Sequence, residues 1–129
     1  MRLRSGFAAA LVLAASSPLP AFAGPEPYGT WLRPEDGTTF TFSRCGGATS
    51  LCVRVKGVRD PADARQIGTV VFSNAALVAE NVWRGEVYNP DDGQRYMGKI
   101  TLTGAASLTL EGCVMGGAIC KGETWTRLR

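Results

Sequence analysis

The clearest pattern in the chain is an alternation of apolar and polar positions on either side of a short turn. From Trp83 to Tyr88, and again from Tyr96 to Leu102, every second residue is apolar or glycine. Residues 89–93 read Asn-Pro-Asp-Asp-Gly, which combines a fixed proline φ, side chains that bond their own backbone and a glycine that accepts positive φ. A period of two with one polar face predicts a half-buried antiparallel hairpin.

The same signals recur along most of the chain. Residues 59–65 suit a surface loop, and residues 75–82 are interpreted as a connection, although a strand or one helical turn also fits them. Many short strands with local connections predict an all-β fold, a small antiparallel up-and-down barrel of about eight strands, because closure removes exposed edges. A strongly bent half-barrel or a sandwich is the alternative. The further strands are expected at residues 29–32, 38–44, 53–58, 69–72, 108–112 and 120–127.

Three glycines stand in the middle of expected strands, namely Gly85, Gly98 and Gly112. A glycine inside a strand permits strong coiling of the sheet or a close approach by another group. These positions therefore predict either a tightly coiled sheet or close packing beneath an aromatic ring.

The N-terminal segment has the pattern of an export signal. Arg2 and Arg4 form a positively charged start, an apolar run follows, and Ala21 and Ala23 form a small-x-small cleavage signature. The apolar run is too short to span a bilayer as a mature helix. We therefore expect residues 1–23 to be a signal peptide cleaved after Ala23, and residues 24–129 to form a single all-β domain in the periplasm.

The net charge and the chain length limit the expected partners and the number of domains. The chain carries 14 Lys and Arg residues against 11 Asp and Glu residues. Loss of Arg2 and Arg4 with the signal leaves 12 cations against 11 anions, a net charge of +1, so we expect no nucleic-acid partner. The 106 residues that remain after cleavage (129 minus 23) suffice for one small domain. We expect a monomer without a transmembrane segment.

Four cysteines in an exported chain are expected to form disulfides. Six residues separate Cys45 from Cys52, six separate Cys113 from Cys120, and each interval contains a Gly-Gly pair. Of the three possible connectivities, this spacing favours the two local pairs, each of which would close a hairpin across its own loop. A four-thiolate zinc site would need tighter spacing and a reducing compartment, so we expect no metal.

The residues that carry most catalysis are scarce in this chain. Histidine is absent, which excludes Ser-His-Asp and Cys-His mechanisms. A two-carboxylate hydrolase could use Glu86 with Glu111 or Glu123, but these residues alternate with apolar ones and are expected to face solvent. Asp91 and Asp92 are interpreted as turn residues, because a lone acidic pair lacks the ligand count of a calcium loop. We expect neither an enzyme nor a cofactor.

The order and spacing of several motifs resemble one known family. These motifs are Gly29-x-Trp31, Asp36-Gly37, Cys45-Gly46, Leu51-Cys52, the hairpin from Trp83 to Tyr96, Leu110-x-Gly112-Cys113, Cys120 and Trp125-x-Arg127. Over residues 29–127 the chain is similar to the bacterial exported family called domain of unknown function 2147. The resemblance implies a small exported protein with a compact β-barrel, loosely lipocalin-like, and no established activity. Many members have a longer Pro- and Asp-rich loop where this chain has residues 59–67, so a function residing in that loop would not transfer.

Two non-enzymatic functions remain. The first is a binding module that holds a small apolar ligand in the mouth of the barrel. Its candidate lining residues are the aromatic side chains Trp31, Trp83, Tyr88, Tyr96 and Trp125. Three of them, Trp31, Trp83 and Tyr96, would otherwise simply fill the barrel, and Tyr88, on the opposite face from Trp83, is the better candidate for an exposed contact.

The second is a structural or interaction protein that contacts an envelope partner through a surface patch. Its candidate residues are cations expected on outward faces, and a solvated face is the plainer interpretation of the same pattern. They are Arg84, Arg95, Lys99 and Arg127.

Overall fold

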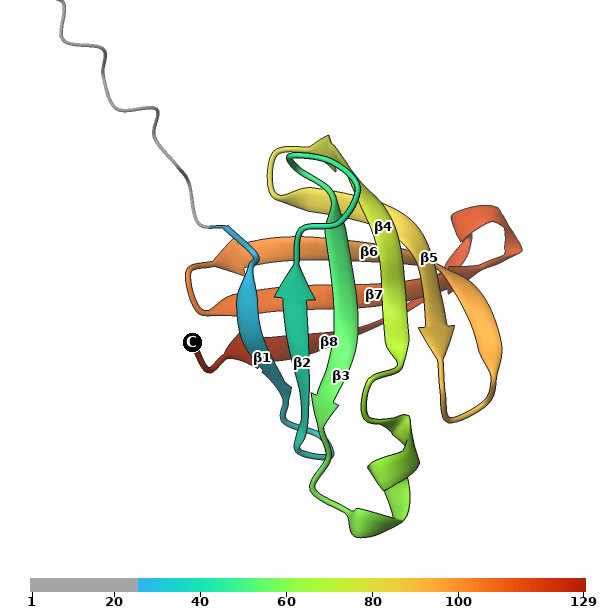
Figure 1. Ribbon diagram of the computed structural model, residues 1–129. Coiled ribbons are helices and arrows are strands. Elements are labelled where there is room, and N and C mark those ends of the chain that lie inside the picture. The colour runs from blue at the N-terminus through green and yellow to red at the C-terminus, as the bar shows by residue number, and fades with distance from the viewer. Residues whose placement is uncertain (1–25) are drawn as a thin grey trace, which may run out of the picture.

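The computed structural model describes residues 26–129 as one closed barrel in which each strand is antiparallel to its neighbours and β8 returns to β1 (Figure 1). The prediction of an all-β up-and-down barrel of about eight strands is confirmed, and the sheet is neither a half-barrel nor a sandwich. The predicted signal peptide and its cleavage after Ala23 lie outside the described residues. The strands are β1 (Gly29–Arg33), β2 (Thr38–Ser43), β3 (Leu51–Gly57), β4 (Val70–Ala79), β5 (Val82–Asn89), β6 (Gln94–Gly104), β7 (Ser107–Val114) and β8 (Ile119–Arg127), with 3-10 helices η1 (Pro61–Gln66) and η2 (Met115–Gly117).

The alternation of the central hairpin sets the inside and outside of the barrel. On β5 and β6, Trp83 pairs with Ile100 and Val87 with Tyr96, so the apolar positions of both strands share one face. Trp83 and Ile100 are only 5% and 1% exposed, whereas Arg84, one residue along β5, is exposed. The predicted hairpin is confirmed, and its apolar face is the barrel interior.

The meander gives the barrel two different ends. We call the end that carries the start of β1, the C-terminus and the β2–β3, β4–β5 and β6–β7 connections the closed end. The end that carries the β1–β2, β5–β6 and β7–β8 connections, together with η1 between β3 and β4, is the open end (Figure 1).

Two segments differ from the prediction. Residues 75–82 are not a connection: β4 continues to Ala79 and joins β5 through a two-residue turn in which Asn81 has φ 60°. Asparagine tolerates this left-handed conformation, so the chain can reverse without a glycine. The predicted surface loop at residues 59–65 contains the short helix η1, which begins with the side chain of Asp60 accepting a hydrogen bond from the backbone N–H of Ala62.

Mid-strand glycines make room for one aromatic ring. Gly85 and Gly98 are cross-strand partners, and the ring of the buried Phe72 on β4 lies over both. A Cβ at Gly98 would come within 2.5 Å of the ring, and a Cβ at Gly85 within 2.9 Å. Close packing beneath an aromatic ring is therefore confirmed for these two glycines, whereas a Cβ at Gly112 would meet only an ordinary contact at 3.8 Å.

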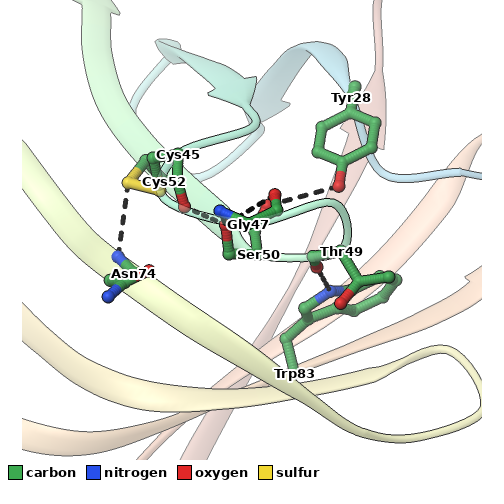
Figure 2. Close-up of a disulfide and its surroundings, with 8 residues drawn as sticks. All are labelled: Tyr28, Cys45, Gly47, Thr49, Ser50, Cys52, Asn74 and Trp83. Carbon is green, nitrogen blue, oxygen red and sulfur yellow. Dashed lines mark hydrogen bonds between the residues drawn. A yellow bond between two sulfur atoms is a disulfide. The ribbon is translucent and has the colours of Figure 1, made fainter.

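Both predicted disulfides are present. Cys45 bonds to Cys52 across the β2–β3 loop at the closed end, and Cys113 bonds to Cys120 between β7 and β8 at the open end (Figure 2 shows the first). The first bond fixes the ends of a loop that lies over the barrel interior. Thr49 in that loop accepts the indole N–H of Trp83 at 2.9 Å through its carbonyl.

Residues that flank β1 and end β8 complete the closed end. The indole N–H of Trp31 donates to the carbonyl of Pro27 at 2.8 Å, and the guanidinium of Arg127 stacks 4.6 Å from the centre of the Trp31 ring. Arg127 also donates to the carbonyl of Tyr28 at 2.7 Å. Trp31 is consequently fully buried, between the main chain at Pro27 and the side chain of Arg127.

Candidate functional site: a cavity at the open end of the barrel

The open end contains a cavity of about 710 Å³ that is open to solvent. Its inner wall is apolar and includes Val55, Val71 and Leu110 from three different strands. Phe40 and Trp125 lie at its base as a stacked pair, with ring centres 4.1 Å apart and planes 15° apart. Cavities of this size and lining suit small organic ligands.

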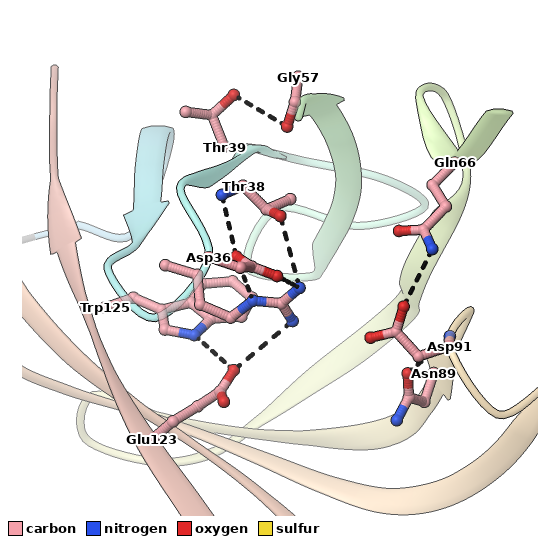
Figure 3. Close-up of polar contacts among 10 residues, drawn as sticks. Asp36, Thr38, Thr39, Gly57, Gln66, Asn89, Asp91, Glu123 and Trp125 are labelled. Carbon is pink, nitrogen blue, oxygen red and sulfur yellow. Dashed lines mark hydrogen bonds and ion pairs between the residues drawn. The ribbon is translucent and has the colours of Figure 1, made fainter. Parts of the chain in front are cut away.

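One side of the cavity carries an ion-pair cluster centred on Arg33, the last residue of β1. Arg33 binds Asp36 in the β1–β2 turn through two hydrogen bonds, Nε to Oδ1 at 3.0 Å and Nη2 to Oδ2 at 2.6 Å. Its Nη1 lies 3.7 Å from Oε1 of Glu123 on β8. The same Oε1 accepts the indole N–H of Trp125 at 2.8 Å, so the cluster connects the turn to the base of the cavity (Figure 3).

This arrangement keeps both partners charged. Burial raises the pKa of the Asp36 carboxyl, but hydrogen bonds from Arg33 and Thr38 and the charge of Arg33 outweigh burial and hold the pKa at about 2. Burial lowers the pKa of Arg33, but its bond to Asp36 and the nearby carboxylates raise it above the ordinary value. A bidentate pair of this kind fixes the position of the guanidinium beside the cavity.

The opposite side of the cavity is formed by the β5–β6 turn. The side-chain amide of Gln66, on η1, donates to Asp91 at 3.0 Å (Figure 3), and the hydroxyl of Tyr96 donates to Asp92. The bond from Tyr96 lowers the pKa of Asp92 and raises that of Tyr96. Both carboxylates are at the rim, where they contribute negative charge.

The turn itself has the chemistry predicted from its sequence. The backbone N–H of Asp91 donates to Asn89 Oδ1 at 2.9 Å, and that of Gln94 donates to Asp92 Oδ1 at 2.8 Å. Gly93 has φ 71°. The interpretation of Asp91 and Asp92 as turn residues is confirmed, and the structure adds their contacts with Gln66 and Tyr96.

The five predicted aromatic residues divide between the two ends of the barrel. Trp125, Tyr96 and Tyr88 all line the cavity. Tyr88 lies at the rim, where Arg95 stacks 5.1 Å from its ring centre. Trp31 and Trp83 do not border the cavity, because they pack at the closed end.

Two charged residues are not where the alternation was expected to put them. Glu123 was expected to face solvent but lines the cavity, and Arg127 was expected on an outward strip but stacks on Trp31. Both lie two residues from Trp125, and side chains two apart on a strand share a face. The buried Trp125 therefore determines their direction.

The remaining predicted carboxylates do face outward. Glu86 pairs with Arg95 at 3.0 Å, and Glu111 lies 3.9 Å from Lys99. Glu111 also lies near Cys113 and Cys120 within residues 26–129, but both sulfurs belong to the second disulfide, so this group does not have the free thiolates that a metal site would use.

Several residues of the cavity are not singled out by the sequence motifs. Arg33 could have been found because it lies two residues after the buried Trp31 and shares its face. Gln66 has none, because it comes from η1 and approaches the rim through tertiary structure alone.

A closed eight-stranded antiparallel barrel with one packed end and one open cavity is a lipocalin-like fold. A solved structure of similar fold is described as protein HP1028 from the human pathogen Helicobacter pylori, which belongs to the lipocalin family. The TM-score is 0.62 at 18% sequence identity, and the match covers 81% of this chain and 84% of that chain. At this identity the likeness concerns the fold.

The family follows from the sequence match. Residues 29–127 match the family described as "Uncharacterized protein conserved in bacteria (DUF2147)", and the chain belongs to that family, as the motifs indicated. No match was found among curated proteins. No helix within residues 26–129 has the length and hydropathy to cross a membrane.

Proposed function

We propose that this protein is an exported, non-enzymatic binding module that holds a small apolar or amphipathic ligand in the cavity at the open end of the barrel. The observation that carries the proposal is the combination of an apolar base with a polar rim. Phe40 and Trp125 stack beneath an open space of about 710 Å³, and burial of an apolar ligand there would be favourable by the hydrophobic effect. Tyr88 and Tyr96 would contact the ligand near the rim.

The periplasmic location belongs to the same proposal. It is supported by the charged, apolar and small-residue pattern of residues 1–23 and by two disulfides, which persist in oxidising compartments. N-terminal sequencing of the periplasmic fraction is expected to begin at Gly24, and a chain retaining Met1 would contradict export.

The binding test uses the neutral fluorescent probe N-phenyl-1-naphthylamine. We expect saturable fluorescence enhancement with the wild-type protein and its loss in Val87→Phe, because Val87 lines the cavity and a larger side chain would occupy it. The matched control is Val78→Phe, since Val78 is 52% exposed and does not border the cavity. Equal binding by the two variants, with both folded, would show that the probe binds elsewhere.

A second candidate function, interaction with an envelope partner, rests on the outer face of β5 and β6. Arg84 and Lys99 are cross-strand neighbours there, beside a groove that also includes the half-exposed Met97. Arg84→Glu together with Lys99→Glu would abolish capture of such a partner but leave probe binding unchanged.

Catalysis by paired carboxylates receives little support from the cavity. A general acid needs a carboxyl group whose pKa is raised towards neutrality, whereas the pKa of Asp36 is lowered to about 2. Turnover of esterase, glycosidase or peptidase substrates that disappears in Glu86→Gln, Glu111→Gln or Glu123→Gln would contradict the non-enzymatic proposal.

A further inference from the structure

The polar groups of the cavity are unequal in charge, and this inequality bears on the kind of ligand. Among the residues that line it are five carboxylates, which belong to Glu35, Asp36, Asp91, Asp92 and Glu123. Among residues 26–129, only two cations, Arg33 and Lys121, line the same space. The lining therefore carries an excess of three negative charges, although the mature chain as a whole is close to neutral.

Arg33, the less exposed of the two cations, is already paired with carboxylates. Arg33 donates two hydrogen bonds to Asp36, and its third nitrogen lies 3.7 Å from Glu123. A guanidinium that is neutralised in this way has little capacity to attract the carboxylate of a ligand. Lys121 lies near the rim, where its side chain is exposed to solvent and its charge is screened.

The carboxylate of Glu123, by contrast, retains one oxygen with no hydrogen-bond partner among residues 26–129. The contacts of Glu123 with Arg33 and Trp125 both use Oε1, so Oε2 is left to accept a hydrogen bond from a ligand. Glu123 stands between the apolar base and the rim, because Trp125 follows it by two residues on the same face of β8. Asp91 and Asp92 place further negative charge on the opposite side.

We infer that the ligand of this cavity is a cationic amphiphile, with an alkyl or aryl group against Phe40 and Trp125 and a protonated amine or quaternary ammonium between Glu123 and the Asp91–Asp92 turn. This inference rests on the proposed function and adds the charge of the ligand's polar group. Tyr96 at the rim presents an aromatic ring, which also attracts a cation. A fatty acid would place its carboxylate among like charges and is disfavoured.

The test compares three probes of equal chain length, octyltrimethylammonium, octanol and octanoate, in displacement of N-phenyl-1-naphthylamine below their micelle concentrations. At low ionic strength we expect the cation to bind at least about tenfold more tightly than octanoate, with octanol between them, because opposite charges a few ångströms apart attract in a partly desolvated site. The difference is expected to shrink in high salt.

Two variants locate the effect. Glu123→Gln and Asp91→Asn should each narrow the difference between cation and octanoate, and Asp91→Asn serves if loss of the Trp125 contact unfolds the first variant. Glu86→Gln is the matched control, because Glu86 faces outward and pairs with Arg95. Octanoate binding as tightly as the cation, or equal affinities for all three probes, would overturn the inference while leaving the binding module intact. Failure of every probe, the naphthylamine included, would overturn both.

Discussion

The three tryptophans of the barrel interior differ in what accepts their indole N–H. At the closed end, Trp31 donates to the carbonyl of Pro27 and Trp83 to the carbonyl of Thr49. At the open end, Trp125 donates to the side chain of Glu123. The two backbone acceptors belong to segments outside the strands of their tryptophans, whereas Glu123 lies on the same strand as Trp125.

This difference explains why one end is filled and the other is hollow. Residues 26–28 lie against the fully buried Trp31 at the closed end, and the loop bounded by Cys45 and Cys52 lies against Trp83. The connections at the open end bond mainly within themselves or to the rim, as Asp36 does with Arg33. The buried indole N–H groups therefore have hydrogen-bond acceptors at both ends of the barrel. The arrangement at the open end also leaves space for a ligand.

The largest effect should follow from removing the ring at the centre of the closed end. Trp31→Ala is expected to lower the free energy of unfolding by about 3–5 kcal/mol, because a fully buried aromatic leaves a cavity. Tyr96→Ala, at the half-exposed rim, should cost less than about 2 kcal/mol. Urea denaturation of both variants gives the comparison, and similar losses would show that the two ends are equally packed.

The next effect concerns the glycine pair between the ends. Gly98→Ala should destabilise the protein by about 1–3 kcal/mol, because its Cβ would lie 2.5 Å from the ring of Phe72, which is itself buried. Gly104→Ala is the control, since no atom lies within 4 Å of the position that its Cβ would take. If both variants have the same urea midpoint, the Phe72 ring can move without loss of stability, and its packing against Gly98 is not tight.

The two disulfides offer a matched comparison between the ends, because each closes a loop of the same length. On chain entropy alone, replacing either pair with serine should cost about 2 kcal/mol. We expect a greater loss for Cys45→Ser with Cys52→Ser, because that loop also positions Thr49 against Trp83. Thermal unfolding measures both, and a smaller loss at Cys45 and Cys52 would mean that the loop does not depend on its bond.

The smallest expected effect is the pH dependence due to Asp36. Its pKa is about 2 in the folded protein against an ordinary value of 3.8, so its contribution is present above pH 3.8 and is lost as the pH falls through about 2. The side chain is 44% exposed, so after discounting for solvent screening the contribution is at most about 1 kcal/mol. Wild type and Asp36→Asn should differ in urea midpoint at pH 5 and converge near pH 2. A difference that persists at low pH would assign the effect to packing.

The strand pattern could be predicted from the sequence, because the period of two identifies which residues share a face. The same rule, applied outward from Trp31 and Trp125, would have placed Arg33, Glu123 and Arg127 inside. Charge alone is a poor sign of exposure at these positions, because ion pairs and stacking on an aromatic ring compensate for partial burial.

Other features required the tertiary structure. The bond from Gln66 to Asp91 joins residues 25 apart, and no local pattern reports it. The extent of β4 was also missed, because Ala76, Leu77 and Val78 are all exposed and the irregular pairing of β4 with β5 removes the alternation on which the strand prediction depends.

The pairing of β1 with β8 also has a consequence for the order of folding. Every other pair of strands joins neighbours in the sequence, whereas the bond from Arg127 to Tyr28 spans 99 residues. Bringing distant parts of the chain together has the largest loop-closure entropy cost. The pairs of sequential strands can therefore form before β1 pairs with β8. The pairing of β1 with β8 is then the last strand pairing to form, and weakening it at Arg127 should accelerate unfolding more than it slows refolding in stopped-flow measurements.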